Sequence, residues 1–252
     1  MIDLKKTGIT VLSIFFIFIL WLIAGMVVDN PLLLPKPWEV LKAFVQIFID
    51  AGSLNVIWHT ILRLLVGLLL AFLTGFFFGV IAGFSKSFAL FINPIVTALR
   101  TIPVISITVI LLIMFGFKFT PYIITFMMLF PLIFQGTYGG ITSIDAELID
   151  VYRLEDNHFF TGLIHCYLPL ISQNIRTALL QSLGLGIKVL VMAEYLSQTR
   201  DSIGNQLYLA KVNLEYDQVF AWTILLILMA LLFEVLINHY KPIAEKIKKS
   251  SN

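Results

Sequence analysis

Charged side chains inside apolar segments are the first candidates for chemistry in this sequence. Arg100, Lys188 and Glu194 fall within or at the edges of long hydrophobic runs. A charge at the centre of a membrane helix costs at least about 2.5 kcal/mol, so such residues usually face protein or water. Two interpretations of Lys188 remain open. It is either a cavity charge that attracts an anion, or one half of an interhelical ion pair with Glu194 or another carboxylate.

Residue types that are common in enzyme sites do not form a convincing set here. His158 and His165 are seven residues apart, but two histidines without a carboxylate or thiolate make a poor metal site. Cys166 follows His165 directly, and adjacent residues of a helix do not face each other. The phosphate-binding pattern G-x-x-x-x-G-K-[ST] does not occur. The sequence predicts a chain that is not an enzyme and holds no cofactor or metal.

The composition indicates that lipid is the solvent of the elements that carry these charges. Of the 252 residues, 59% are hydrophobic and 13% are charged, whereas soluble domains carry about 25% charged residues. At about 20 residues per crossing, the chain has room for five to seven membrane helices but not for an additional ATPase domain. The net charge of +2 argues against a nucleic-acid partner.

Six apolar segments predict an all-α, polytopic membrane protein with about six transmembrane helices. They cover approximately residues 9–28, 57–84, 90–115, 121–141, 168–196 and 218–237. Residues 39–49 read as a short amphipathic helix, residues 116–120 as a break, and the stretch after residue 196 as a loop. We therefore divide the chain into three parts: a first helix with an external amphipathic segment (1–56), a core (57–240) and a basic tail (241–252).

The positive-inside rule places both ends of the chain in the cytoplasm. Lysines cluster near each terminus, and Lys86 lies between the second and third spans. With an even number of spans, the polar segment of residues 145–167 is then cytoplasmic as well. Lys36, Lys42, Arg200 and Lys211 fall on the opposite side, so the bias is modest.

Within this polar segment, residues 147–153 have the composition of a short helix. Asp145 precedes them as an N-cap that can accept hydrogen bonds from free backbone amides. Leu148, Val151 and Tyr152 lie three and four residues apart, which places them on one face. Such a ridge is suited to a groove on a partner protein.

Three glycines in the second span predict close helix packing. Gly75, Gly79 and Gly83 recur at intervals of four and therefore lie on one face. Small residues at this spacing let a neighbouring membrane helix approach closely. We expect a packing role for them and no direct contact with a substrate.

The polar segment resembles the EAA loop of bacterial ABC importer permeases. That pattern is E-A-A, a glycine, and later L-P, and here the spacing is intact. Further stretches resemble the nitrate, aliphatic sulfonate, taurine and thiamine-precursor branch, over about residues 34–240: L-P-K-P-W-E-V from Leu34, A-L-R-T-I-P from Ala98 and A-E-Y-L from Ala193. The positions that match or flank the EAA pattern are Glu147, Asp150, Val151, Tyr152, Arg153, Asp156, Leu168 and Pro169.

The resemblance implies a type I ABC importer permease fold in a cell membrane. It implies a second permease copy, two ATPase subunits that bind ATP-Mg, and an extracytoplasmic substrate-binding protein. The EAA segment would receive force from the ATPases, and Arg100, Lys188 and Glu194 would lie in the translocation pathway. Four departures lead us to expect a dedicated ATPase: Asp150 replaces the glutamate, Val151 and Tyr152 replace the two alanines, and Asp156 replaces the glycine.

An ion-coupled secondary transporter is the alternative from another class. Such a protein would favour paired carboxylates deep in its spans and inverted repeats. The sequence has few intramembrane acids and shows no repeat, so we rank this alternative second.

Overall fold

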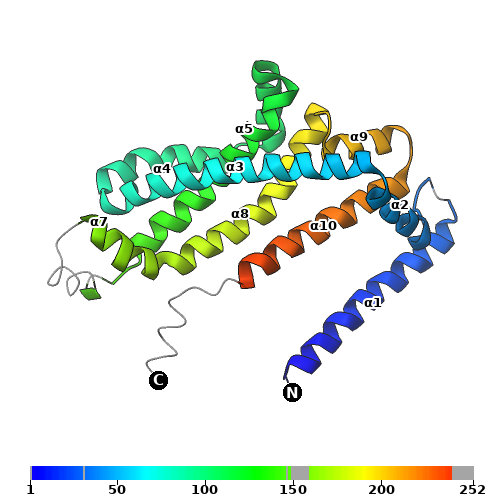
Figure 1. Cartoon of the computed structure of the whole chain (residues 1–252), viewed down its shortest axis with the longest axis horizontal. Coiled ribbons are helices and arrows are strands. Elements are labelled where there is room, and N and C mark those ends of the chain that lie inside the picture. The colour runs from blue at the N-terminus through cyan, green and yellow to red at the C-terminus, as the bar shows by residue number, and fades with distance from the viewer. Residues whose placement is uncertain (1, 31, 146, 149–158, 240–252) are drawn as a thin grey trace.

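The computed structural model describes residues 2–30, 32–145, 147–148 and 159–239, and within them every regular element is a helix. Five of these helices are long and apolar enough to cross a membrane (Figure 1). Helix α5 packs between α3 and α8, and these three helices form the centre of the bundle. The predicted all-α polytopic fold is confirmed.

Helix α1 (Ile2–Val28) stands at the edge of the bundle, and its described side chains from residue 11 onward are almost all exposed. The turn after it is held by an ion pair between Lys36 Nζ and Asp29 Oδ1 at 2.8 Å. Helix α2 (Pro37–Ile49) then begins with proline at its first position, where no backbone N–H is needed. It buries Val40, Ala43 and Ile47 against the bundle.

Helix α3 (Ala51–Phe84) starts six residues before the predicted start of the second span. Asp50 explains the difference, because its carboxylate accepts hydrogen bonds from the backbone N–H (2.7 Å) and the hydroxyl (2.8 Å) of Ser53. This cap satisfies an amide that the first helical turn leaves without a partner.

The predicted third span, residues 90–115, is wrong as a single helix. Helix α4 (Lys86–Thr101) ends at Thr101 with Ile102 as its C-cap, and α5 (Val104–Thr142) begins after Pro103. Proline disfavours the helical conformation of the residue before it, and Ile102 is indeed extended, with φ −63° and ψ 127°. The segment predicted as the third span is therefore divided between α4 and the first part of α5.

The predicted break at residues 116–120 is confined to Gly116. This residue has φ 70° and ψ 175°, a region that residues with a side chain almost never adopt. The chain turns there and resumes helical geometry at once, through Thr120 and Pro121. Figure 1 shows the resulting bend, with the first part of α5 projecting from the bundle.

Helices α7 (Phe159–Gly162), η1 (Leu163–Tyr167) and α8 (Leu168–Ser197) form one continuous helical stretch. The wide π turn η1 lies immediately before Pro169, and its N–H to O=C bond runs from Leu168 back to Leu163. A proline ring clashes with the carbonyl four residues earlier in a regular α-helix, and a π turn relieves that clash. The predicted start of the fifth span at Leu168 agrees with the start of α8.

Helix α9 (Ile203–Val212) lies where the sequence predicted only a loop. Ser202 caps it by accepting a hydrogen bond from Asn205 N at 3.0 Å. Helix α10 (Tyr216–His239) follows and runs back along α8 (Figure 1). It buries Ala221, Trp222 and Leu225 in a core shared with α2 and α9.

Candidate functional site

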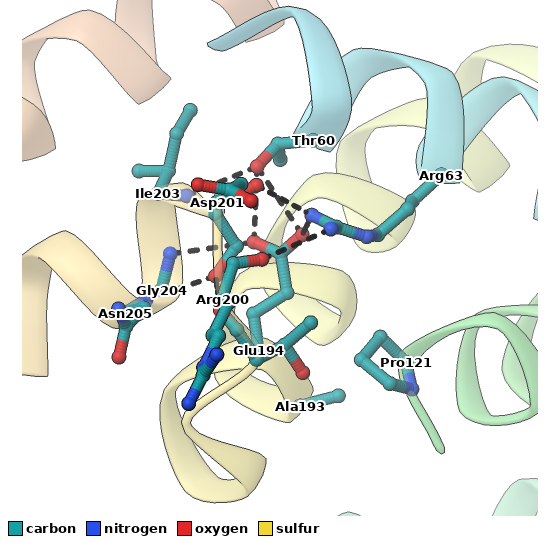
Figure 2. A network of polar contacts seen from close by, with 12 residues as sticks. Thr60, Arg63, Pro121, Ala193, Glu194, Arg200, Asp201, Ile203, Gly204 and Asn205 are labelled. Carbon is teal, nitrogen blue, oxygen red and sulfur yellow. Dashed lines mark hydrogen bonds and ion pairs between the residues drawn. The ribbon is translucent and has the colours of Figure 1, made fainter. Parts of the chain in front are cut away.

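Glu194 lies near the end of α8 and is completely buried (0% exposed). Its Oε1 is 3.0 Å from Nη1 of Arg63 on α3, and the side chain of Arg63 is 10% exposed. The hydroxyl of Thr60, one turn before Arg63, lies 3.2 and 3.1 Å from the two carboxylate oxygens. Figure 2 shows the three side chains converging between α3 and α8.

The start of α9 completes this network. Gly204 N donates to Oε2 of Glu194 at 3.3 Å, and Ile203 N donates to the hydroxyl of Thr60 at 3.0 Å. Arg63 donates in turn to the carbonyls of Arg200 (3.1 Å) and Asp201 (3.0 Å) (Figure 2). The network thus joins α3, α8, α9 and the loop between α8 and α9.

Gly204 permits the close approach on which these contacts depend. A Cβ atom at this position would lie 2.4 Å from Tyr195 N, 2.5 Å from Glu194 Cβ and 2.6 Å from Val191 O. Two of these neighbours are backbone atoms, which cannot move aside as a flexible side chain can. Only glycine therefore fits between α9 and α8 at this point.

Within the described residues, Glu194 is paired with a residue of α3 and does not line the groove that contains Arg100. Its ion-pair partner is Arg63 rather than Lys188, whereas Lys188 itself is exposed. Glu194 thus lies inside packed protein at the end of α8. It stands apart from the groove to which Arg100 belongs.

That groove opens between α4, α5 and α8 and has a volume of about 400 Å³. At its edge, Nη1 of Arg100 donates to Oε1 of Gln135 at 2.7 Å. The lining is mostly amide, hydroxyl and small side chains. It consists of Arg100, Leu132, Gln135, Gly136, Gln173, Asn174, Thr177, Ala178 and Gln181.

Exposed polar residues follow one side of α8, from the groove lining to a position beyond it. We call the set Asn174, Thr177, Gln181 and Lys188 the polar stripe; all four are exposed. Their separations of three, four and seven residues place them on one face of the helix. All four lie in a segment that is apolar enough to cross a membrane.

The predicted coupling segment is described only at its two ends. Glu147 N donates to Oδ1 of Asp145 at 3.3 Å, and Glu147 and Leu148 are both exposed. At the other end, Leu168 begins α8 and Pro169 occupies its first turn. The predicted contact residues Asp150, Val151, Tyr152, Arg153 and Asp156 lie outside the described residues.

The predicted packing glycines lie on the face of α3 that meets α5. A Cβ added at Gly75 would lie 2.9 Å from Ile133 Cβ, and one at Gly79 would lie 2.7 Å from Thr137 Cβ. At Gly83 the distance to Ile141 Cγ2 would be 2.7 Å. Gly67, which the predicted set does not include, belongs to the same face and meets Thr125 Cγ2 at 2.7 Å. Extending the four-residue spacing backward through Ala71 reaches it.

Both polar arrangements were missed from the sequence, although each left a signal. Thr60 and Arg63 are one turn apart in an otherwise apolar span, so they share a face that a buried acid on another helix can meet. The polar stripe shows as amide and hydroxyl residues at helical spacing within the fifth span. Spacing alone does not show which of these residues meet in space, because that depends on how α3, α8 and α9 pack.

Five helices long and apolar enough to cross a membrane, together with a groove of mostly polar lining, are typical of a membrane transport protein. Comparison with protein families agrees: residues 75–244 match the family described as binding-protein-dependent transport system inner membrane component. The chain belongs to this family and is a multi-pass membrane protein. Membership favours this class over the ion-coupled secondary transporter.

Two relatives with assigned names cover most of the chain. An aliphatic sulfonates transport permease, named SsuC, of Bacillus subtilis is 28% identical over 212 residues, which cover 83% of this chain and 76% of that protein. The taurine transport system permease protein TauC of Escherichia coli is 26% identical over 221 residues, covering 85% of this chain and 80% of that protein.

Proposed function

We propose that this chain is the permease subunit of an ATP-driven importer of a small solute of the sulfonate or taurine kind. The names of the two relatives support this substrate class. The solute would arrive on an extracytoplasmic binding protein and leave toward the cytoplasm. The proposal places both termini and residues 145–167 in the cytoplasm.

The polar stripe on α8 is the observation that carries the proposal. Its four side chains are exposed in a segment that is apolar enough to span the membrane. In hydrocarbon, an amide without a hydrogen-bond partner costs several kcal/mol, so lipid is an unfavourable neighbour for this face. A water-filled pathway between two copies of the chain satisfies these groups. We therefore propose a homodimer with the groove and the stripe facing the pathway.

Two ATPase subunits would bind ATP-Mg and press on the segment before Leu168. Because α7, η1 and α8 form one continuous helical stretch, movement of this segment passes directly into the helix that carries the polar stripe. Asp150 and Tyr152 are the proposed contact residues, on the strength of the EAA resemblance.

The decisive experiment is reconstitution of the transporter in liposomes. The chain is co-expressed with candidate ATPase and binding-protein subunits from its source organism, and the purified complex is supplied with radiolabelled taurine or ethanesulfonate. We expect the ATPase to co-purify and uptake to require both ATP and the binding protein. Uptake driven by an ion gradient in the absence of ATPase would contradict the proposal.

The coupling role is tested by replacing Asp150→Ala together with Tyr152→Ala. We expect the double variant to insert in the membrane normally but to lose most ATPase co-purification and ATP-dependent uptake. A matched pair of exposed residues elsewhere, Asn213→Ala with Lys211→Ala, serves as the control. Wild-type uptake by the Asp150/Tyr152 variant would show that the coupling contact lies elsewhere.

A further inference from the structure

We infer that the groove between α4, α5 and α8 is itself an anion-selective site, so that the permease contributes to substrate selection. Arg100 is the anchoring charge, and Lys188 is the next cation along the polar stripe. The inference rests on the proposed function, because it assumes that the groove opens into a water-filled pathway. It goes further in assigning a ligand class to residues of this chain.

The charges around the groove have a single sign. Arg100 is the charged residue of its lining, and the lining contains no carboxylate. Lys188 lies seven residues beyond Gln181 on the same face of α8 and is exposed. Among the described residues of α3, α4, α5 and α8, the acidic side chain is Glu194, and its charge is neutralised by Arg63.

The described charges of α10 do not reverse this field. Asp217 and Glu234 lie in the first and last parts of that helix, and α10 contributes no residue to the groove. The exposed cations Lys86 on α4 and Lys118 on α5 carry charge of the same sign. An anion that enters the groove therefore meets a positive potential, and a cation is repelled.

Arg100 is held in position for such a ligand. Its Nη1 donates to the amide oxygen of Gln135 at 2.7 Å, which fixes the guanidinium at the groove edge. Guanidinium groups carry five N–H donors in a planar fork that matches the oxygens of an oxyanion. Because Gln135 uses one donor in the described structure, the others remain for a ligand.

The neutral lining suits a small ligand with several oxygens. The amide groups of Gln173, Asn174 and Gln181 can donate from their nitrogens. Thr177 already donates its hydroxyl hydrogen to Gln173 O at 2.9 Å, so it offers an acceptor instead. The expected ligand is therefore a small sulfonate or a similar oxyanion. The positive charge of Arg100 favours a negatively charged ligand, and the lining amides donate further hydrogen bonds to its oxygens.

Thiol-modification rates measure the sign of this field even where the transported solute is unidentified. Cys166 is the single cysteine of the chain, so Cys166→Ser provides a cysteine-free background. Thr177→Cys then places one thiol in the groove of the full transporter in membranes. An anionic reagent, sulfonatoethyl methanethiosulfonate, is compared with the cationic trimethylammonioethyl analogue. Each rate is divided by the rate of that reagent with a free thiol.

We expect the anionic reagent to react faster by about tenfold after this correction, since Arg100 lines the same groove as the thiol. Arg100→Gln should remove most of that preference and Arg100→Lys should keep it. Ethanesulfonate at millimolar concentration should slow the anionic reagent, and ethylammonium should not. Leu232→Cys, exposed on α10, is the lipid-facing control and should react with neither reagent.

The outcomes separate the two proposals. Equal rates for both reagents at Thr177→Cys, or a preference for the cationic one, would overturn the anion site and leave the water-filled pathway standing. No reaction with either reagent in any nucleotide state would overturn both. A preference that survives Arg100→Gln and Lys188→Gln unchanged would also remove the anion site, because its charges would lie elsewhere.

Discussion

At the scale of single residues, the buried pair of Arg63 and Glu194 has the largest energetic consequence. A charge that loses its partner in a buried site costs about 3 to 5 kcal/mol, far more than the net contribution of an exposed pair. Thr60, Gly204 and two loop carbonyls complete the hydrogen bonding of this pair. The network therefore fixes where α9 sits on this end of the bundle.

Removing either partner should destabilise the protein strongly. We expect Glu194→Gln and Arg63→Met each to cost about 3 kcal/mol, because each leaves the other charge or its carbonyl partners unpaired. The double variant should cost about 2 kcal/mol less than the sum of the two. Unfolding in detergent measures all three, with the exposed Glu234→Gln as the control for loss of an acid. Strict additivity would show that the two side chains do not interact.

Acid should weaken the start of α3 through Asp50. Hydrogen bonds from the side chain and backbone of Ser53, and from the backbone of Gly52, hold the pKa of Asp50 below its usual value. A depressed pKa stabilises the folded state above the unfolded pKa, about 3.9, and this contribution disappears as pH falls through the folded pKa. Asp50→Asn keeps a good cap without a titrating group.

Melting temperatures of the wild type and Asp50→Asn therefore report this group. We expect the difference between the two proteins to be constant from pH 5 to 7 and to shift against the wild type below about pH 4. Asp145→Asn is a useful comparison, because Asp145 Oδ1 likewise accepts a hydrogen bond from a nearby backbone amide, Glu147 N. Parallel curves at every pH would show that Asp50 does not carry the effect.

At the scale of elements, the close contact between α3 and α5 depends on glycines of α3, which have no side chain. The glycines of α3 let its backbone approach α5 so closely that Phe134 O would lie 3.0 Å from a Cβ at Gly79. In lipid, helices gain little from burying apolar surface against each other, so close van der Waals packing supplies much of the stability.

Gly79→Ala should force these two helices apart. The new Cβ would lie 2.7 Å from Thr137 Cβ, and we expect a loss of about 1 to 3 kcal/mol. Gly139→Ala is the matched control, since nothing lies within 4 Å of its Cβ position. It should be neutral or stabilising by up to about 1 kcal/mol. Equal effects of the two variants would exclude close packing as the reason for glycine at residue 79.

The apolar segments could be located from hydropathy, because a membrane span is a local property of about 20 residues. Hydropathy placed the break between the third and fourth spans at residues 116–120, but it shows no interruption at Pro103, because apolar residues flank this proline on both sides. Helix α9 was missed because its polar and apolar residues do not alternate with a clear helical period. The helix is stabilised instead by its Ser202 cap and by its tertiary contact with Glu194.

The candidate site likewise has one part that local sequence spacing predicts and one part that depends on the packing of distant segments. The spacing of Gly75, Gly79 and Gly83 is local information and identified a shared face. The partner of Glu194 is not local, because Arg63 precedes it by 131 residues and reaches it only through the packing of α3 on α8. From the sequence, Lys188 was considered as a partner for Glu194 because it lies only six residues away. The structure pairs Glu194 with Arg63 instead.

At the scale of the whole molecule, the two ends of the bundle differ. One end carries α2 and α9, and the other carries the start of α4, the end of α5 and α7 (Figure 1). The buried ion pair belongs to the first end, because Glu194 contacts Gly204 of α9, and Lys86 belongs to the second, because it begins α4. The proposed orientation puts the first end outside the cell and the second inside.

Labelling from one side of the membrane tests this orientation. In the Cys166→Ser background, Asn213→Cys and Glu147→Cys place exposed thiols at opposite ends of the bundle. A membrane-impermeant maleimide added to intact cells with a permeable outer envelope should label Asn213→Cys alone. Permeabilising the inner membrane should add labelling of Glu147→Cys. The reverse pattern would invert the topology and remove residues 145–167 from the reach of the ATPases.

The unbroken helical stretch from α7 through α8 has a mechanical consequence. Its far end is pinned where Glu194 meets Arg63, and at 1.5 Å per residue Leu163 lies about 45 Å from that pivot. A tilt of about 5° would then carry Leu163 through about 4 Å but Thr177 through only about 2 Å. In the proposed mechanism this helical stretch would act as a reducing lever. A large displacement at the end that the ATPases are proposed to push would become a small displacement beside Thr177.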